Sequence, residues 1–178
     1  MKLFGKLIYF LLCLTVFLEL SIYFLPKKQL LYYTSSKLNA YFISFEPKQV
    51  KDNGFKLILK DTTFKYDKLP MATSKEITLF SLLFVDKIVI KDIYLSDIAL
   101  DILPKKVDLI TICWTPLSGY KVKLYAKGDI GEANGYIDLF HRKLILYLKA
   151  SKKAKRKYAD ILRQMKKEAK GYKYVKSF

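Results

Sequence analysis

The sequence predicts a mainly β protein. It has an N-terminal transmembrane helix, an antiparallel meandering β-sheet (an open, curved sheet is one form it can take) and a C-terminal amphipathic helix. Residues 7–25 are apolar, residues 41–150 alternate apolar and polar side chains between turn signals, and residues 151–171 switch to a helical period. The expected segments are a transmembrane anchor, a juxtamembrane helix or connector, an antiparallel β domain, and a basic amphipathic helix with its tail, over 1–25, 26–40, 41–150 and 151–178.

The anchor is the run LIYFLLCLTVFLELSIYFL, residues 7–25, in which Glu19 is the single formal charge. As an α-helix it would be about 28 Å long, close to the roughly 30 Å of a hydrocarbon core. The run is longer than a signal-peptide core, and no small-residue cleavage site follows it, so we expect an uncleaved anchor. Lysines flank both ends, so the positive-inside rule gives no orientation.

Glu19 is the residue of this run whose position needs a reason. A carboxylate inside a membrane segment costs about 3 kcal/mol near the centre and less near an end. Two interpretations stay open. The side chain reaches the interface or is protonated, or it contacts a partner helix.

After the anchor, Pro26 can start a short amphipathic helix over residues 26–40. Leu30, Leu31, Thr34 and Leu38 would share one face of it at helical spacing. The simplest interpretation of this segment is a connector between the membrane and the β domain.

Period-two alternation divides the middle of the chain into strands. The first, at 41–46, is expected to end at Pro47. Turns or loops are expected at Lys51–Gly54, Leu69–Lys75, Pro104–Lys106, Thr115–Gly119, Gly128–Gly131 and His141–Lys143. The short last loop favours antiparallel pairing.

Two features of this region go beyond simple alternation. Lys60-Asp61 and Lys91-Asp92 each lie between strand-like runs, and an internal structural repeat is one interpretation, with chance as the other. Ile98, Leu100 and Ile102 continue the alternation in a further strand.

The C-terminal segment carries a helical stripe opposite a basic face. The stripe consists of Ala154, Tyr158, Ile161, Leu162, Met165 and Ala169. Ser151 can cap its start and Gly171 its end. The candidate basic site consists of Lys152, Lys153, Lys155, Arg156, Lys157, Arg163, Lys166 and Lys167.

The sequence offers no catalytic, cofactor-binding or metal-binding set. The stretch GDIGEANG matches neither GxGxxG nor the P-loop spacing, so we expect a hairpin loop there. Cys13, Cys113 and His141 are too few for a zinc site, and the two cysteines are too far apart in the expected fold for a disulfide. We therefore expect a protein that is not an enzyme and uses no cofactor.

The net charge of +17 is carried mainly by lysine, and such a balance can also reflect a biased genome. Nearly all the basic residues are lysine, whereas arginine is preferred for bidentate phosphate recognition, so nucleic acid is disfavoured as a partner. The expected partners are the lipid bilayer and other membrane or periplasmic proteins of an assembly, with a bound lipid as a further candidate.

One stretch resembles a known family. AKGDIGEANGYIDLFHRKLILYLKAS, Ala126 to Ser151, follows a pattern of strand, Gly-x-x-Gly, Gly-x-hydrophobic-Asp-Leu, basic turn and aliphatic strand. With the anchor, the FSLLF strand and the IVIKDIYL run, it resembles the protein N family of type II secretion systems, which in turn resembles the AsmA-like membrane-anchored β proteins. The resemblance implies a periplasmic β domain on a Gram-negative inner membrane, without catalysis.

Three functions are compatible with these features. The first is a structural or assembly component of a type II secretion-like or related pilus or transformation apparatus. The second is AsmA-like handling of a lipid or other hydrophobic ligand, which an open groove lined by Phe, Leu and Ile would favour. The third is binding of the basic tail to an anionic membrane or nucleic acid, which would weaken steeply with salt.

Overall fold

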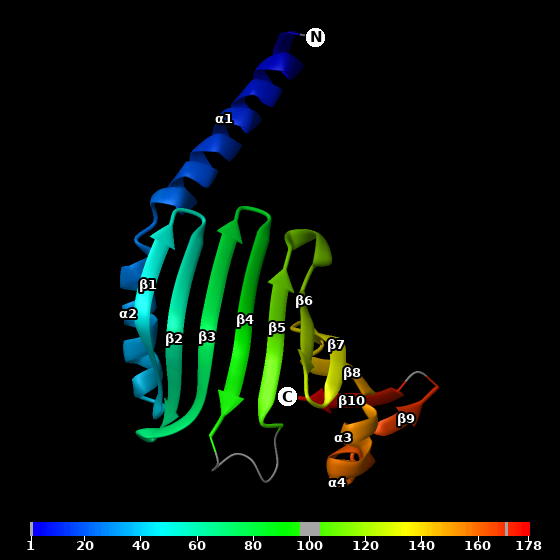
Figure 1. The fold of residues 1–178 in the computed structure, drawn as a ribbon. Coiled ribbons are helices and arrows are strands. Elements are labelled where there is room, and N and C mark those ends of the chain that lie inside the picture. Colours follow the sequence, from blue (N-terminus) through cyan, green and yellow to red (C-terminus); the bar gives the residue numbers. More distant parts are fainter. Residues whose placement is uncertain (1, 97–103, 170) are drawn as a thin grey trace.

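The computed structural model describes residues 2–96, 104–169 and 171–178. Within these residues, ten strands form one open antiparallel sheet, in the order β1-β2-β3-β4-β5-β6-β7-β8-β10-β9 (Figure 1). The predicted mainly β fold with an N-terminal apolar helix is confirmed. The elements are α1 (Lys2–Phe24), α2 (Lys27–Asn39), β1 (Ile43–Asn53), β2 (Lys56–Tyr66), β3 (Leu69–Leu82), β4 (Val85–Leu95), β5 (Lys106–Trp114), η2 (Pro116–Ser118), β6 (Lys121–Gly128), β7 (Gly131–Asp138), β8 (Lys143–Ala150), α3 (Lys152–Lys157), α4 (Ala159–Arg163), β9 (Lys166–Glu168) and β10 (Gly171–Ser177).

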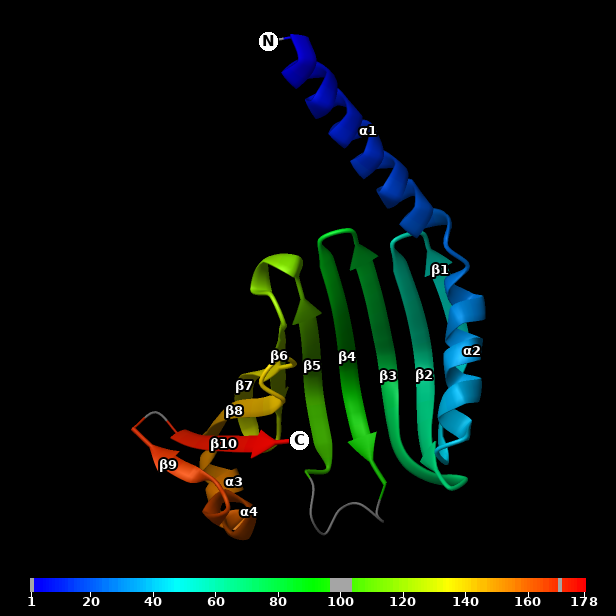
Figure 2. The ribbon, with the colours of Figure 1, turned by 180° about the vertical axis from the view of Figure 1, so that it is seen from behind.

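Helix α1 projects away from the sheet, whereas α2 lies along β1 and covers one face (Figures 1 and 2). Within the described residues, one stretch, Phe4–Phe24, is long and apolar enough to cross a membrane, with a mean hydropathy of 2.2. Leu31 of α2 is buried against Leu57, Leu59 and Ile77 of the sheet. The predicted connector is therefore a helix that is part of the fold.

Two aspartates in left-handed conformation interrupt the strands at matching places. Asp61 in β2 has φ 48° and Asp92 in β4 has φ 49°. Each shifts the alternation by one residue, so the buried side chains Leu59 and Thr62 stand three positions apart. The two Lys-Asp pairs noted in the sequence thus occupy equivalent positions in alternate strands of the sheet.

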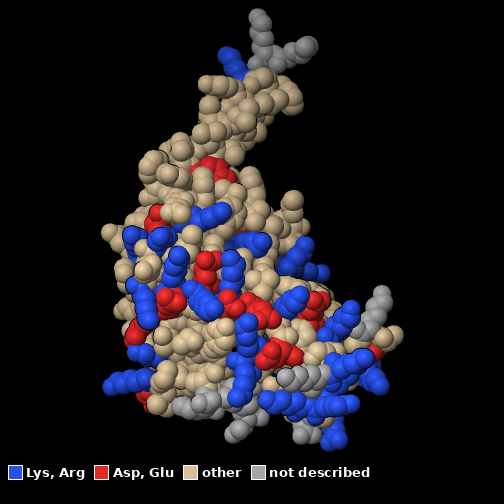
Figure 3. Space-filling model, viewed as in Figure 1, with Lys and Arg blue, Asp and Glu red and all other residues tan. Residues whose placement is uncertain are grey.

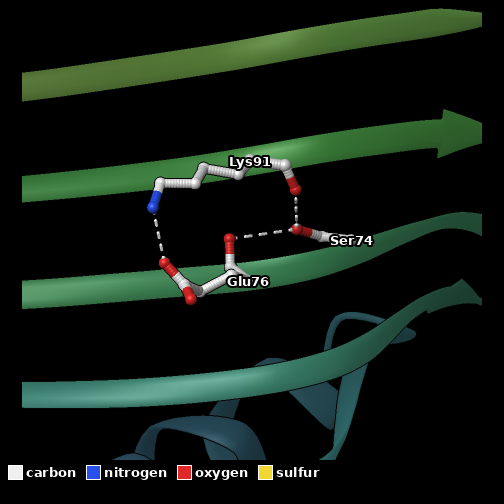
Figure 4. Close-up of polar contacts among 3 residues, drawn as sticks. All are labelled: Ser74, Glu76 and Lys91. Carbon is white, nitrogen blue, oxygen red and sulfur yellow. Dashed lines mark hydrogen bonds and ion pairs between the residues drawn. The ribbon is translucent and has the colours of Figure 1, made fainter.

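Ser74 closes the gap that this interruption leaves between β3 and β4. Its hydroxyl donates to the Lys91 carbonyl oxygen at 2.9 Å, and Glu76 and Lys91 form an ion pair of 2.8 Å beside it (Figure 4). Ser74 is buried, so this hydrogen bond satisfies a hydroxyl that water does not reach. Its cross-strand neighbour Thr62 is also buried, but Thr62 Oγ1 has no hydrogen-bond partner among the described residues.

The difference between the Ser74 and Thr62 hydroxyls predicts different effects of removing them. Ser74→Ala is expected to lower the free energy of unfolding by about 0.5–1.5 kcal/mol, because it removes the hydrogen bond to the Lys91 carbonyl oxygen. Thr62→Val, which keeps the shape and removes an unpaired hydroxyl, is expected to be neutral or stabilising. Chemical denaturation of both variants measures the difference, and equal losses would contradict this account of the two hydroxyls.

Several expected boundaries were wrong. Residues 51–53 of the expected turn at Lys51–Gly54 belong to β1, and residues 131–135 of the expected hairpin loop GDIGEANG belong to β7. Strand β1 runs through Pro47 to Asn53, because β1 is an edge strand, where a missing N–H breaks no ladder. The expected loop at Leu69–Lys75 is the first half of β3. Asp67 and Lys68, both at positive φ, make the reversal in two residues, so the next strand starts at once. The expected strand with Ile98, Leu100 and Ile102 lies outside the described residues.

The C-terminal segment also differs from the single helix expected. Ser151 caps the start as predicted, with the Ala154 N–H donating to Ser151 Oγ at 3.1 Å, and the helical part ends at Arg163. Gly171 opens β10 instead of capping a helix, and its lack of a side chain allows the close approach to the Leu148 carbonyl oxygen. Strand β10 pairs antiparallel with β8, from the pair of Tyr172 and Leu148 to the pair of Ser177 and Lys143, and so extends the sheet.

Candidate functional site

The sheet has one apolar and one charged face. Cross-strand register aligns apolar side chains from β2 to β8 on the face that α2 covers: Leu59, Ile77, Ile90, Ile110, Ala126, Ala133 and Leu148. The adjacent row on the other face contains Lys60, Glu76, Lys91, Leu109, Lys127, Glu132 and Lys149. Figure 3 shows acidic and basic side chains intermingled over the face turned away from α2. The apolar face is the first candidate for a functional surface.

Cover over this apolar face is uneven. Beneath α2, Leu57, Leu59 and Ile77 are buried. Further along the same face, Ile90 of β4 and Ile110 of β5 are only half-buried. A half-buried aliphatic row on an open sheet is a surface that an apolar ligand can cover.

A groove lies where the end of α1, helix α2 and strands β2–β4 meet. Its volume is about 420 Å³, within the range of small-molecule sites. Its apolar lining consists of Ile22, Leu25, Leu30, Leu31, Phe55, Leu57, Leu79, Phe80 and Ile88. Its polar lining consists of Lys27, Thr34, Ser81, Asp86 and Lys87. The groove thus begins at the foot of the membrane-type helix and continues onto the apolar face.

Polar groups of the groove have partners within the protein. The Lys27 ammonium donates to the Ile22 carbonyl oxygen at 2.6 Å and so satisfies the end of α1. Ser81 Oγ donates to Asp86 Oδ1 at 2.6 Å. These polar groups are therefore satisfied within the protein and do not need a polar ligand.

Glu19 lies against the sheet of its own chain. Its Oε1 accepts a hydrogen bond of 3.1 Å from the Leu83 backbone N–H in the β3–β4 turn. Within the described part of the chain, its Oε2 is buried without a hydrogen-bond partner. Contact with a partner helix stays a prediction, because the structure contains a single chain.

Tyr23 makes a second contact between α1 and the sheet. Its ring packs edge-on against Phe55, with 5.2 Å between ring centroids, and covers Gly54 in the β1–β2 turn. Gly54 has φ 66°, which suits glycine, and the absence of a side chain leaves room for the ring. The two contacts dock the last turns of α1 on the end of the sheet.

The candidate basic tail is divided between two kinds of structure. Lys152, Lys155, Arg156 and Lys157 are exposed on α3, and Arg163 is exposed at the end of α4. Lys166 and Lys167 are exposed in β9, and the side chain of Lys153 is outside the described set. These residues therefore do not share one helix face, and their binding to a membrane or nucleic acid stays a prediction.

Ion pairs elsewhere fit structural roles. A hydrogen bond from the Lys91 ammonium holds the pKa of the Glu76 carboxyl below its ordinary value. Lys106 bridges Asp108 at 2.8 Å and Asp92 at 3.4 Å, and its pKa is raised chiefly by the hydrogen bond to Asp108. Among the residues that the structure describes, no group of three or more His, Cys, Asp or Glu could hold a metal ion.

Acid is expected to weaken the β7–β8 turn. Asp138 accepts hydrogen bonds from the His141 backbone N–H at 2.9 Å and from His141 Nδ1 at 3.0 Å, and these lower its pKa from the ordinary 3.8. Because the pKa of Asp138 is lower in the folded state than in the unfolded state, its ionised carboxylate stabilises the fold. This stabilisation is fully present at pH values above the ordinary pKa and is lost as the pH falls through the lowered, folded-state pKa. Acid unfolding of the wild type and Asp138→Asn measures this: their stability difference should shrink on acidification, and a constant difference would contradict the assignment.

No family model, curated protein sequence or solved structure matches this chain. The class that the fold and the groove define is an open antiparallel sheet docked, within the described residues, on one membrane-type helix. Sequence reasoning missed the groove itself, because it forms only when α2 folds back over β2 and β3. Leu30, Leu31 and Thr34, all on the predicted apolar face of that helix, were the signal for it.

Proposed function

We propose that this protein is a membrane-anchored, non-enzymatic β protein that holds the acyl chain of a lipid on the apolar face of its sheet. The observation that carries the proposal is the groove of about 420 Å³ at the foot of α1, with its lining of Leu, Ile and Phe. An open groove of this composition is the feature that favours AsmA-like lipid handling among the functions drawn from the sequence. The half-buried row that continues across β4 and β5 gives a longer chain somewhere to lie.

The energetics favour exchange of a lipid over permanent storage. Each methylene gains about 0.8 kcal/mol on leaving water, whether it enters protein or bilayer. An acyl chain that moves between the groove and an adjacent bilayer therefore gains little net free energy. Such a site suits a protein that takes lipid up and gives it back.

Crosslinking with a photoreactive acyl lipid tests the proposal. The full chain is reconstituted in phospholipid nanodiscs that contain the probe, and crosslinked peptides are mapped by mass spectrometry. We expect adducts on β2–β4 peptides that contain Leu57 and Leu79, in addition to adducts on α1. Adducts confined to α1 would refute the proposal, since any membrane helix meets bulk lipid.

A matched pair of variants on α2 isolates the groove. Leu30 and Tyr32 are both exposed on this helix, at 47% and 61%, but only Leu30 lines the groove. Leu30→Asp is expected to remove most of the β2–β4 adducts, because it places a charge in the groove. Tyr32→Asp is expected to leave them unchanged.

We further propose that α1 spans the inner membrane once and leaves the sheet in the periplasm, as the family resemblance suggests. A reporter fused after Phe178 tests the orientation. A periplasmic signal is expected, and a cytoplasmic signal would remove both the periplasmic location and a secretion role.

A second candidate function is a structural part of an envelope apparatus, and the open edge of the sheet favours it. Strand β1 has eleven residues and pairs, within the described chain, with β2 alone. An edge of this kind can accept a strand from another protein. Crosslinking from Lys48 or Gln49 to a co-purifying envelope protein would support this function, and crosslinks that reach only lipid would count against it.

A further inference from the structure

The β3–β4 and β5–β6 tips lie at the end of the sheet where α1 is attached (Figures 1 and 2). Both carry exposed apolar side chains. Phe84 in the β3–β4 turn is 57% exposed, and Leu117 in the β5–β6 connection is 100% exposed. At the opposite end, the β2–β3 turn is Asp67-Lys68, flanked by the exposed side chains of Tyr66 and Leu69. Exposed apolar side chains therefore occur at both ends of the sheet, and the contact of Glu19 with Leu83 is what places the β3–β4 tip beside α1.

The Glu19 hydrogen bond sets the level of the β3–β4 tip relative to α1. Leu83 contacts Glu19, which precedes the end of α1 at Phe24 by five residues. At about 1.5 Å per residue, the contact lies roughly 7.5 Å along the helix from its end. The apolar sequence continues to Leu25, so a bilayer that surrounds the whole apolar run also surrounds this tip.

The β5–β6 connection satisfies its own polar groups and leaves its apolar side chain outside. Trp114 Nε1 donates to the Gly119 carbonyl oxygen at 3.0 Å, and Ser118 Oγ donates to the Thr115 carbonyl oxygen at 2.6 Å. Internal pairing of this kind is required of any backbone that enters an apolar medium. Trp114 and the exposed Tyr120 next to the tip are residue types enriched at membrane interfaces.

We propose that the β3–β4 and β5–β6 tips insert Phe84 and Leu117 into the lipid interface beside α1, as a second contact of this protein with the bilayer. Continuity with α1 selects lipid as the occupant, because a tip hydrogen-bonded to a membrane-spanning helix faces the same medium as that helix. This inference rests on the proposed anchoring by α1. Its consequence is that the sheet stands with its groove mouth at the leaflet surface.

The single tryptophan of the chain, Trp114, reports on the β5–β6 tip directly. The full chain is reconstituted in phosphatidylcholine–phosphatidylglycerol vesicles with or without bromine atoms high on the acyl chains. Trp114 fluorescence is expected to lose most of its intensity in brominated vesicles. A second chain, with Trp114→Phe and Leu69→Trp, places the reporter at the opposite end of the sheet and is expected to keep its intensity.

Variants at the tips assign the effect to the proposed side chains. Leu117→Asp changes a fully exposed residue, so the fold is retained, and quenching of Trp114 should fall. Tyr66→Asp, at the far end of β2, should leave it unchanged. Quenching that persists when Phe84→Asp and Leu117→Asp are combined would overturn the proposal.

Vesicle flotation distinguishes failure of the α1 anchor from failure of the tip insertion. A chain that floats with the vesicles while Trp114 stays unquenched would overturn the tip insertion and leave the α1 anchor intact. A chain that fails to float would overturn the anchor and, with it, the tip contact. Flotation with quenching of Trp114 and not of Leu69→Trp supports both.

Discussion

Leu59→Ala is expected to lower the free energy of unfolding by about 2–5 kcal/mol, the range for large-to-small changes at well-packed core positions. Leu59 is 2% exposed and packs with Leu31, Leu57 and Ile77 in the cluster that joins α2 to the sheet. Because a domain of this size is stable by only about 5–15 kcal/mol, the change removes a large share of the total. Denaturant unfolding of the full chain in detergent, followed by loss of sheet signal, measures it.

Leu69→Ala is the matched control for this prediction. Leu69 lies at the start of β3 and is 53% exposed, so its truncation is expected to change stability by less than about 0.5 kcal/mol. A loss at Leu59 no larger than that at Leu69 would mean that the cluster under α2 is not the core that stabilises the sheet.

The features that sequence reasoning predicted are those encoded locally. The apolar run around Glu19 predicts a helix by length alone, and Gly54 and Gly119 mark reversals that the structure contains. Ser151 was recognisable as a helix cap from its position before a helical stripe. In each case, neighbours in the sequence supply the deciding interaction.

The features that it missed depend on contacts between distant segments. Strand β3 starts at Leu69 because Asp67 and Lys68, both at positive φ, reverse the chain in two residues. In the sequence, Pro70 is the stronger turn signal, so it predicts a loop where the strand begins. The C-terminal β10 forms because β8 presents an open edge, which no local pattern near Gly171 reveals.

The groove is missed for the same reason. Its lining comes from α1, α2 and three strands, and the periodicity of each shows an apolar face without showing what that face meets. The repeated Lys-Asp pairs were recognised in the sequence, but their structural role was not predicted. Asp61 and Asp92 shift the apolar side chains of β2 and β4 by one position, which keeps one face apolar across an interruption of the ladder.

Gly54→Ala is expected to undock α1 from the β1–β2 turn and to cost about 1.5–3.5 kcal/mol. A Cβ at this position would lie 2.0 Å from Tyr23 Cε2, so the ring must leave, and its edge-on contact with Phe55, worth roughly 0.5–1.5 kcal/mol, is lost. The left-handed backbone, at φ 66°, adds about 1–2 kcal/mol for any residue with a Cβ. Denaturant unfolding in detergent measures the sum.

A Tyr23→Ala background separates these two contributions, because it removes the ring that an added Cβ at Gly54 would meet. Gly54→Ala made in that background should show the backbone cost alone, and the excess cost in the wild-type background is then the cost of displacing Tyr23. An equal cost in the two backgrounds would show that the ring does not dock α1. Because Ile22 and Leu25 line the groove, undocking should also weaken acyl-probe crosslinking to β2–β4. The attachment of α1 to the sheet thus contributes to stability and completes the wall of the groove.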